Sequence, residues 1–258
     1  MDISEGSAIV TGGASGIGAA VVRQLSARGA RVVVADVNIE AGQFLANEVG
    51  GVFVRVDVTD TTEIKNAVAA AEALGPLRVL VNSAGIGSSQ RTVGRDGDFD
   101  SAHDLDTYKR VIAINLIGTF DTIRLAATAM SRTDLLPTAE RGAICNLASV
   151  AAFDGQIGQV AYSSSKGGVV GMTLPLARDL AAIGVRVNTV APGLIDTPIY
   201  GQGDAAESFK AKLGQSVNFP KRLGSPDELA SMVVECITNS YVNGETIRVD
   251  GAIRMPPK

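Results

Sequence analysis

The sequence predicts an α/β fold: a doubly wound parallel sheet of seven strands in a single domain. Short apolar runs rich in Val, Ile and Leu alternate with longer segments of helical periodicity. The apolar runs show little alternation with polar residues, as expected for strands covered by helices on both faces. The 258 residues contain no internal repeat and no low-complexity linker, so one domain is the simplest organisation.

The expected elements alternate along almost the whole chain. We expect strands over residues 7–11, 31–36, 52–56, 78–82, 143–148, 185–190 and 246–249. We expect helices over residues 16–28, 39–49, 61–74, 105–130, 160–182 and 226–238.

Two segments interrupt this alternation. Residues 85–104 are rich in Gly, Ser and Asp and are predicted to form a loop, whereas residues 195–220 carry scattered Gly, Pro and aromatic residues and are predicted to form a substrate flap. Both follow strands, so we expect them at the carboxyl edge of the sheet, where such folds bind ligands.

Composition excludes several classes of function. The net charge of -4 gives no general attraction to nucleic acid or to an acidic membrane. The two cysteines, Cys145 and Cys236, and the one histidine, His103, match no familiar metal-site spacing, and so few cysteines favour a reducing compartment. The N-terminus lacks the features of a targeting peptide, and each long apolar segment is broken by charge or glycine. We therefore expect a cytoplasmic protein that binds neither nucleic acid nor a membrane.

A glycine-rich turn follows the first expected strand and opens the first expected helix. It contains Gly12, Gly16 and Gly18, with Ser15 and Ile17 between them. Glycines let the backbone approach a pyrophosphate, and a helix N-terminus offers free amides and a partial positive charge. An ordinary tight turn is the alternative, but the position between strand and helix favours a dinucleotide site.

Asp36 ends the second expected strand, where dinucleotide-binding folds carry an acidic ribose ligand. A carboxylate accepts hydrogen bonds from both ribose hydroxyls and repels the additional phosphate of NADP. The glycine turn contains no Lys or Arg, and Val37 follows the aspartate. These features predict NAD as the cofactor; the alternative is a turn or capping aspartate before Asn38.

Six motifs, found in order along almost the whole chain, resemble those of the short-chain dehydrogenase/reductase family, which has the Rossmann fold. They are the glycine turn, Asn82-Ser83-Ala84-Gly85, Asn115, Ser149, Tyr162 with Lys166, and Pro192-Gly193. The family commonly has Asn at the position of Ser83, a small departure because that position contributes mainly backbone. The resemblance implies an oxidoreductase that moves a hydride between a nicotinamide and a hydroxyl or carbonyl carbon.

The residue chemistry independently supports this activity. Tyr162 and Lys166 lie four residues apart on an expected helix, so they share one face. A free phenol has a pKa of ~10 and is a poor base at neutral pH, but a nearby ammonium group and the positive charge of the nicotinamide favour the phenolate. We therefore expect a lowered Tyr162 pKa, with the tyrosine taking the alcohol proton during oxidation and returning it during reduction.

The resemblance implies roles for further residues. Ser149 would bind the reacting oxygen, Lys166 the nicotinamide ribose, and Asn115 a water behind the lysine. Each also has an ordinary structural alternative, such as a strand-end cap for Ser149 or a solvated charge for Lys166. The remaining cofactor contacts would come from Asp57 and Val58 beside the adenine, from Ser83, Ala84 and Gly85, and from Pro192, Gly193, Ile195 and Thr197 along the nicotinamide amide.

The second half of the chain resembles a narrower group within the family, the type 2 3-hydroxyacyl-CoA dehydrogenases, also described as 17β-hydroxysteroid dehydrogenases. The likeness lies in residues 149–175, 191–194 and 244–255. It implies NAD-dependent oxidation of short or branched 3-hydroxyacyl-CoA thioesters in fatty acid metabolism, with Gln156 assisting Ser149. Gln156 alternatively is an ordinary loop residue. The family resemblance also implies a homotetramer.

Three other functions stay open at this point. A 3-oxoacyl carrier-protein reductase shares the fold and catalytic residues, but Asp36 argues against its usual NADPH. A hydroxysteroid dehydrogenase is a second alternative. A non-catalytic NAD-binding scaffold is less favoured, because this chain retains both Tyr162 and Lys166.

Overall fold

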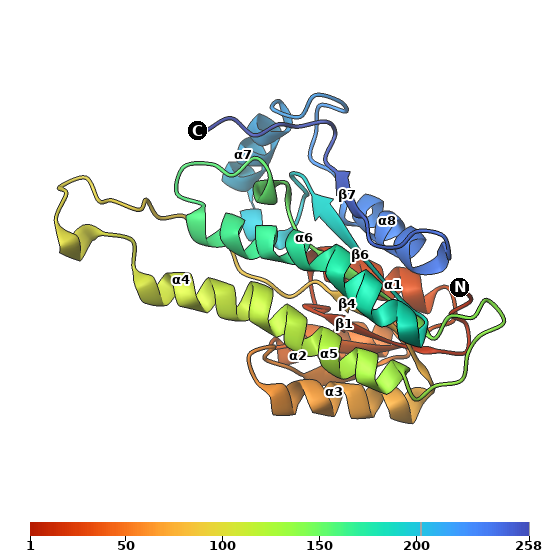
Figure 1. The fold of residues 1–258 in the computed structure, drawn as a ribbon. Coiled ribbons are helices and arrows are strands. Elements are labelled where there is room, and N and C mark those ends of the chain that lie inside the picture. Colours follow the sequence, from red (N-terminus) through yellow and green to blue (C-terminus); the bar gives the residue numbers. More distant parts are fainter. Residues whose placement is uncertain (202, 258) are drawn as a thin grey trace.

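Seven parallel strands form one sheet in the order β3-β2-β1-β4-β5-β6-β7 in the computed structural model, which describes residues 1–201 and 203–257 (Figure 1). The strands are β1 (Ser7–Thr11), β2 (Arg31–Asp36), β3 (Val52–Arg55), β4 (Leu77–Asn82), β5 (Gly142–Leu147), β6 (Val185–Pro192) and β7 (Thr246–Val249). The predicted doubly wound parallel sheet is confirmed, with boundaries shifted by at most two residues.

The helices also follow the predicted order. They are α1 (Gly16–Ser26), α2 (Ile39–Val49), α3 (Thr61–Leu74), α4 (Leu105–Ile112), α5 (Thr119–Met130), α6 (Val160–Leu180), α7 (Asp204–Gly214) and α8 (Pro226–Thr238). The predicted flap contains α7 and one 3-10 turn, Pro198–Tyr200; residue 202, within that prediction, lies outside the described residues.

The prediction of one regular helix over residues 105–130 is wrong in detail. A π-helical turn, Ala113–Gly118, separates α4 from α5. The apolar periodicity continues through this turn, so the pattern of residues does not reveal it. At the end of the turn, Gly118 packs so closely on the loop after β3 that an added Cβ would lie 2.7 Å from the Val58 carbonyl oxygen. Such π turns are frequent at functional sites.

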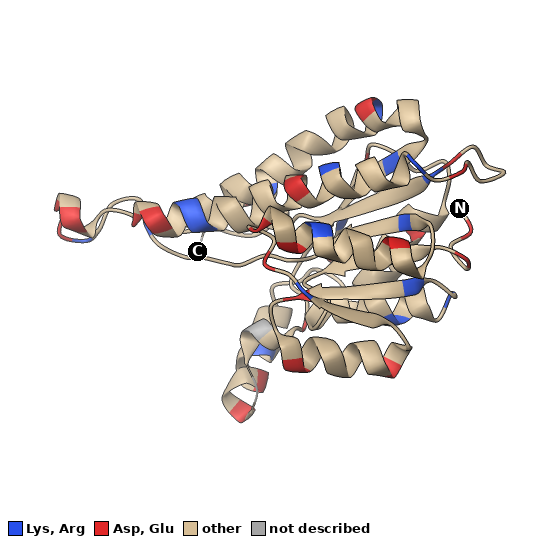
Figure 2. Cartoon of the chain, turned by 90° about the horizontal axis from the view of Figure 1, so that it is seen from below, with Lys and Arg blue, Asp and Glu red and all other residues tan. Residues whose placement is uncertain are grey.

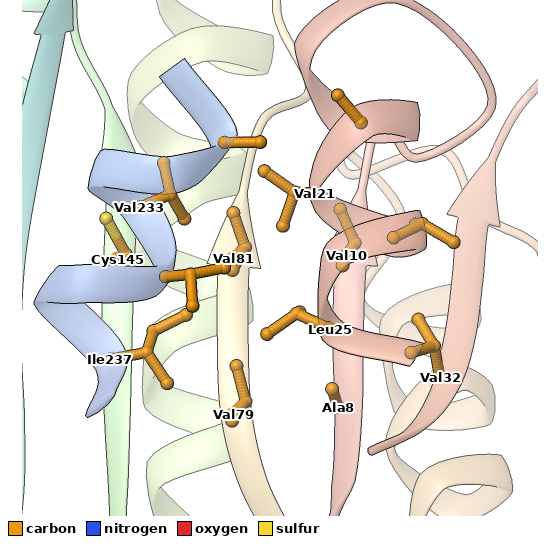
Figure 3. Close-up of a cluster of buried hydrophobic side chains, with 14 of the residues drawn as sticks. Ala8, Val10, Val21, Leu25, Val32, Val79, Val81, Cys145, Val233 and Ile237 are labelled. Atoms are coloured by element: carbon orange, nitrogen blue, oxygen red, sulfur yellow. The ribbon is translucent and has the colours of Figure 1, made fainter. Parts of the chain in front are cut away.

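Two apolar cores cover the faces of the sheet. Figure 3 shows the first, in which Val21 and Leu25 of α1 and Val233 and Ile237 of α8 pack over the central strands, including Val81. The second core packs α3, α5 and α6 on the opposite face. Burial on both faces explains why the strands read as continuous apolar runs.

The strand register brings polar chain segments together at the carboxyl edge of the sheet. Thr11 lies opposite both Ala35 and Asn82, and Asn82 lies opposite Asn146. The turns after β1, β2, β4 and β5 therefore leave the sheet side by side. This edge is where the sequence analysis expects the ligand site.

The segment between β4 and α4 forms a projecting arm, residues 86–104, which extends beyond the end of α4 (Figure 1). Its tip carries Asp96, Asp98 and Asp100, and Figure 2 shows the acidic residues there. The predicted loop is thus confirmed, apart from one 3-10 turn, Phe99–Ser101.

One helical run, Phe99–Met130, is long and apolar enough to cross a membrane by length and composition. Half of the most apolar 18-residue stretch of this run is buried inside the molecule, and α5 packs on α3 and β4. This placement is that of a core helix.

A buried ion pair lies at the start of β6. Arg186 donates from Nε to Glu140 Oε1 at 2.5 Å, and both side chains are more than nine-tenths buried. Arg186 also donates to the carbonyls of Cys236, Ile237 and Val242. Burial opposes ionisation of Glu140, but hydrogen bonds from Arg186, Ser240 and Thr138 outweigh it and hold the carboxyl pKa below its ordinary value.

We predict that Glu140→Ala lowers the free energy of unfolding by about 3 kcal/mol at pH 7, because it leaves the buried Arg186 charge without its partner. Since the folded-state pKa of Glu140 is depressed, the pair stabilises the fold above the ordinary carboxyl pKa. The difference in unfolding free energy between Glu140→Ala and the wild type should shrink as the pH falls through the lowered pKa of Glu140. Urea unfolding across pH measures this, and Glu48→Ala, which removes the exposed partner of Arg23, is the control. Equal losses in the two variants would contradict the prediction.

Candidate active site

The glycine turn is shaped by contacts that exclude any side chain. Gly12 has a φ of 61°, and an added Cβ would lie 2.7 Å from the Ala84 amide nitrogen. A Cβ at Gly18 would lie 2.1 Å from the Gly12 carbonyl oxygen. Ser15 is the N-cap of α1, but its side chain makes no capping bond, and the partly buried Ile17 packs on the first core. The exposed turn of backbone at a helix N-terminus fits a pyrophosphate.

Asp36 joins the end of β2 to this turn. Its carboxylate accepts a hydrogen bond from the Ala14 amide at 3.0 Å and another from the Asn38 amide at 2.9 Å. The second bond is the turn contact that was the alternative to a ribose ligand, while Asn38 itself caps α2. The two contacts fix a partly exposed carboxylate beside the glycine turn, as a ribose ligand requires.

The segments predicted beside the adenosine lie next to this turn. The Ser83 and Ala84 amides donate to Thr11 Oγ1 at 3.2 and 3.3 Å, which holds the loop after β4 against the end of β1. Asp57 accepts hydrogen bonds from the amide and hydroxyl of Thr59, and these bonds lower the pKa of its carboxyl.

The Asn115 side chain is fully buried and joins three elements. Its amide nitrogen donates to the Ile86 carbonyl at 2.9 Å and to Ser165 Oγ at 3.0 Å, and its oxygen accepts from the Ile86 amide at 2.8 Å. An added Cβ at Gly85 would lie 3.2 Å from Asn115 Oδ1 and 3.4 Å from Lys166 Nζ. Asn115 is therefore a positioning residue that brings the loop after β4 beside Lys166. Its predicted role in holding a water stays a prediction.

Ser149, Tyr162 and Lys166 converge at the carboxyl end of β5. Lys166 Nζ lies 5.8 Å from the centre of the Tyr162 ring, on the same face of α6, as predicted. The buried ammonium donates to the Leu147 carbonyl at 2.9 Å. Ser149 follows β5 and caps a 3-10 turn, accepting from the Ala151 amide at 3.1 Å, so the structural alternative for this serine is also observed.

The expected lowering of the Tyr162 pKa includes the charge of a bound nicotinamide and stays a prediction; the protein groups alone shift this pKa upwards. Burial raises the pKa of the phenol, and the nearby Ser149 hydroxyl only partly offsets the effect. Burial also lowers the pKa of Lys166 to about 8, because the ammonium has only neutral partners. The charge that favours the phenolate must therefore come partly from elsewhere, and an oxidised nicotinamide ring carries such a charge.

The first residues of the flap lie close to the glycine turn. β6 ends at Pro192, the Gly193 amide donates to the Val249 carbonyl, and Ile195 pairs with Gly224. A Cβ at Gly16 would lie 3.3 Å from Thr197 Cγ2. The segment predicted to follow the nicotinamide amide thus lies against the glycine turn through Thr197.

The Gln156 side-chain amide donates to the Pro256 carbonyl at 3.1 Å in the C-terminal segment. Its predicted role in helping Ser149 to bind the substrate oxygen stays a prediction. Gln156 lines an open cavity of about 370 Å³. The cavity walls come from the arm, from the loop after Ser149 and from the C-terminal segment: Ser89, Gln90, Arg91, Gln156, Ile157, Gly158 and Pro257.

The short chain dehydrogenase family model matches residues 7–208. The chain belongs to this family. It is 47% identical over 254 residues to the 3-hydroxyacyl-CoA dehydrogenase type-2 of Rattus norvegicus, covering 97% of this chain and 95% of that protein, and 46% identical over 254 residues to the Homo sapiens protein of that name, with the same coverage. The crystal structure of 3-hydroxyacyl-CoA dehydrogenase type-2 from Mycobacterium avium superposes with a TM-score of 0.94 at 44% identity, covering 100% of this chain and 99% of that one.

This short-chain dehydrogenase has one site residue that the sequence analysis missed. Tyr200, at the start of the flap, packs edge-on against Phe209 at 6.2 Å between ring centres. Burial raises the pKa of its phenol, and Tyr162 and Asp196 raise it further. No motif spacing signals this residue, because its surroundings form only in the folded chain.

We predict that Tyr162→Phe lowers kcat about 10²- to 10⁴-fold, because it removes the group that exchanges the substrate proton. Dinucleotide binding should persist, since the ring and Lys166 remain. Turnover and calorimetric titration with the dinucleotide measure the two effects separately.

Tyr200→Phe is the matched control, because it removes a second phenol, one whose pKa Tyr162 raises. It should retain most of the turnover. An equal loss in both variants would refute the assignment of the proton to Tyr162.

Proposed function

We propose that this dehydrogenase transfers a hydride between NAD(H) and the 3-hydroxy or 3-oxo carbon of a short or branched acyl-CoA. The observation that carries the proposal is the near full-length likeness to relatives named for that reaction, combined with the shared face of Ser149, Tyr162 and Lys166. The open cavity beside this face gives space for a thioester that extends outwards.

The catalytic face performs the proton part of the reaction. The glycine turn, Asp36 and Lys166 would hold a nicotinamide dinucleotide, which would supply the hydride chemistry of the reaction. Ser149 and Tyr162 hydrogen-bond the reacting oxygen, and Tyr162 accepts its proton as the carbonyl forms. Lys166, held by the Leu147 carbonyl, binds the adjacent ribose and keeps a positive charge near the phenol. In reduction the proton returns from Tyr162 to the oxygen.

An assay distinguishes this function from its rivals. Oxidation of NADH is followed with acetoacetyl-CoA, its 2-methyl analogue, an acyl carrier-protein thioester, a 17-oxosteroid and a simple ketone. We expect the highest kcat/KM with the CoA thioesters. A preference for the carrier-protein thioester with NADPH, or for the steroid, would replace the proposal. Absence of turnover with all of them would favour a scaffold.

The choice of NAD over NADP is supported by Asp36. Its carboxylate is held beside the glycine turn, where it meets a ribose hydroxyl but repels a phosphate. The turn itself, residues 12–18, contains no Lys or Arg to offset that repulsion.

We predict that Asp36→Ala shifts the ratio of kcat/KM for NADPH over NADH upwards about 100-fold, because a like-charge contact costs several kcal/mol. Steady-state assays with both cofactors measure this ratio. Glu40→Ala, an equal charge change at an exposed position in the first turn of α2, should leave it unchanged. A ratio that moves equally in the two variants would rule out a direct effect of Asp36.

The phosphates of CoA require cations near the cavity. Arg91 lines the cavity. Lys210, a second candidate in the flap, is already paired with Asp196 and Glu207 at 2.9 Å each. This contrast makes Arg91 the stronger candidate.

We predict that Arg91→Glu raises the KM for acetoacetyl-CoA about 10-fold, because the reversed charge faces the CoA phosphates. The KM for a small ketone without phosphates should stay the same. Arg95→Glu, further along the arm, should have a smaller effect on the thioester. Equal increases for the thioester and the ketone would argue against a CoA contact.

We also propose a homotetramer in the cytoplasm. Exposed apolar side chains on the π turn, α5 and α6, namely Ile117, Phe120, Val160 and Leu174, support a surface shared between copies. The cytoplasmic location rests on the sequence expectation alone.

A further inference from the structure

Arg248, on the edge strand β7, is at the centre of a polar cluster outside the catalytic face. It donates from Nη2 to Asp154 Oδ2 at 2.6 Å and from Nε to Asp250 Oδ2 at 2.7 Å. It also donates to the Ile253 carbonyl at 2.9 Å, and its guanidinium lies 5.3 Å from the centre of the Phe153 ring. One side chain thus connects β7, the turn after it and the loop that follows Ser149.

Asp154 belongs to the loop between Ser149 and Tyr162. The loop begins with the 3-10 turn that Ser149 caps, and the Asp154 amide donates to the Val150 carbonyl at 2.9 Å. It ends against α6, where an added Cβ at Gly155 would lie 2.4 Å from Ser163 Oγ. Asp154 therefore lies between the turn that Ser149 caps and the cavity-lining residues Gln156 and Ile157.

The C-terminal segment contacts the same loop. The Gln156 amide group donates to the Pro256 carbonyl at 3.1 Å, and the Ile157 backbone amide donates to the Pro257 carbonyl at 3.0 Å. Pro257, Gln156 and Ile157 all line the open cavity. Arg248 holds the two partners together, because it binds Asp154 of the loop and the Ile253 carbonyl of the segment.

The arrangement depends on the charge of Arg248. The Arg248, Asp154 and Asp250 side chains are 20%, 18% and 8% exposed, so their attraction is only partly screened by solvent. Both carboxylates contact the same guanidinium. Without it they would face each other as like charges, and the loop would separate from β7.

We propose that Arg248 is a positioning residue for the substrate: through Asp154 and the C-terminal segment it fixes the loop after Ser149 as a wall of the acyl-CoA cavity. The inference rests on the proposed function for the identity of the substrate. It assigns to β7, at the edge of the sheet, a part in substrate affinity that is separate from the proton chemistry of Tyr162.

A double-mutant cycle tests the proposal in the full-length enzyme. Arg248→Met, Asp154→Asn and the double variant are assayed for KM and kcat with acetoacetyl-CoA, together with the KM for NADH. Each single variant should raise the KM for the thioester about fivefold or more. The KM of the double variant should not exceed that of the more severely affected single variant, because both residues act through one pair. The KM for NADH in Asp154→Asn should stay within about twofold of the wild type, since this side chain contacts no predicted cofactor residue.

Arg254→Met is the matched control. Arg254 lies in the same C-terminal segment and reaches the same Asp250 at 3.4 Å, but its side chain is 65% exposed. It should leave the KM for the thioester unchanged. If Arg248→Met does not fold, Asp154→Asn decides by itself.

The opposing results are distinct. An unchanged thioester KM in Asp154→Asn, additive effects in the double variant, or an equal increase in Arg254→Met would overturn the role of Arg248. If the wild type does not turn over acetoacetyl-CoA, the proposed function fails instead. The cycle is then run on the carbonyl substrate that the enzyme accepts, where an unchanged KM would still overturn the inference.

Discussion

The buried amide of Asn115 is the contact on which the geometry of the active site depends. It binds the backbone amide and carbonyl of Ile86, after β4, and the Ser165 hydroxyl on α6. These bonds fix the distance between the loop after β4 and α6, the helix that carries Tyr162 and Lys166. The π-helical turn places Asn115 at this junction. Leaving any of these buried polar groups unpaired would cost ~1–3 kcal/mol, which makes the junction specific as well as stable.

Electrostatics at the junction divide the catalytic work between protein and cofactor. Burial raises the pKa of Tyr162 and lowers that of Lys166, so both groups are held closer to their neutral forms than in water. The Lys166 ammonium, 5.8 Å from the ring centre, does not by itself offset the effect of burial on Tyr162. An oxidised nicotinamide bound beside Tyr162 would add a positive charge that favours the phenolate.

The sheet edge supplies the remaining constraint. Parallel strands in register bring the ends of β1, β4, β5 and β6 together. The loop between Ser149 and Tyr162 leaves this edge and lies between α6 and the C-terminal segment. Residues that are about 100 positions apart in the chain, Gln156 and Pro256, therefore share one hydrogen bond. The walls of the open cavity are thus assembled from segments that lie far apart in the sequence.

The sequence by itself determined the sheet, the order of its elements and the catalytic face. Apolar runs without alternation can only be buried on both sides, and Tyr162 and Lys166 lie one helical turn apart wherever the helix packs. The glycines of the first turn were equally readable, because Gly12 and Gly18 occupy positions where a Cβ would meet backbone atoms.

Tertiary structure alone decided the π turn at Asn115, the direction in which the protein groups alone shift the Tyr162 pKa, the partner of Gln156 and the surroundings of Tyr200. Each depends on burial or on contacts between distant segments. Periodicity and spacing describe only what lies within a few residues along the chain, and they carry no information about which distant groups will surround a side chain after folding.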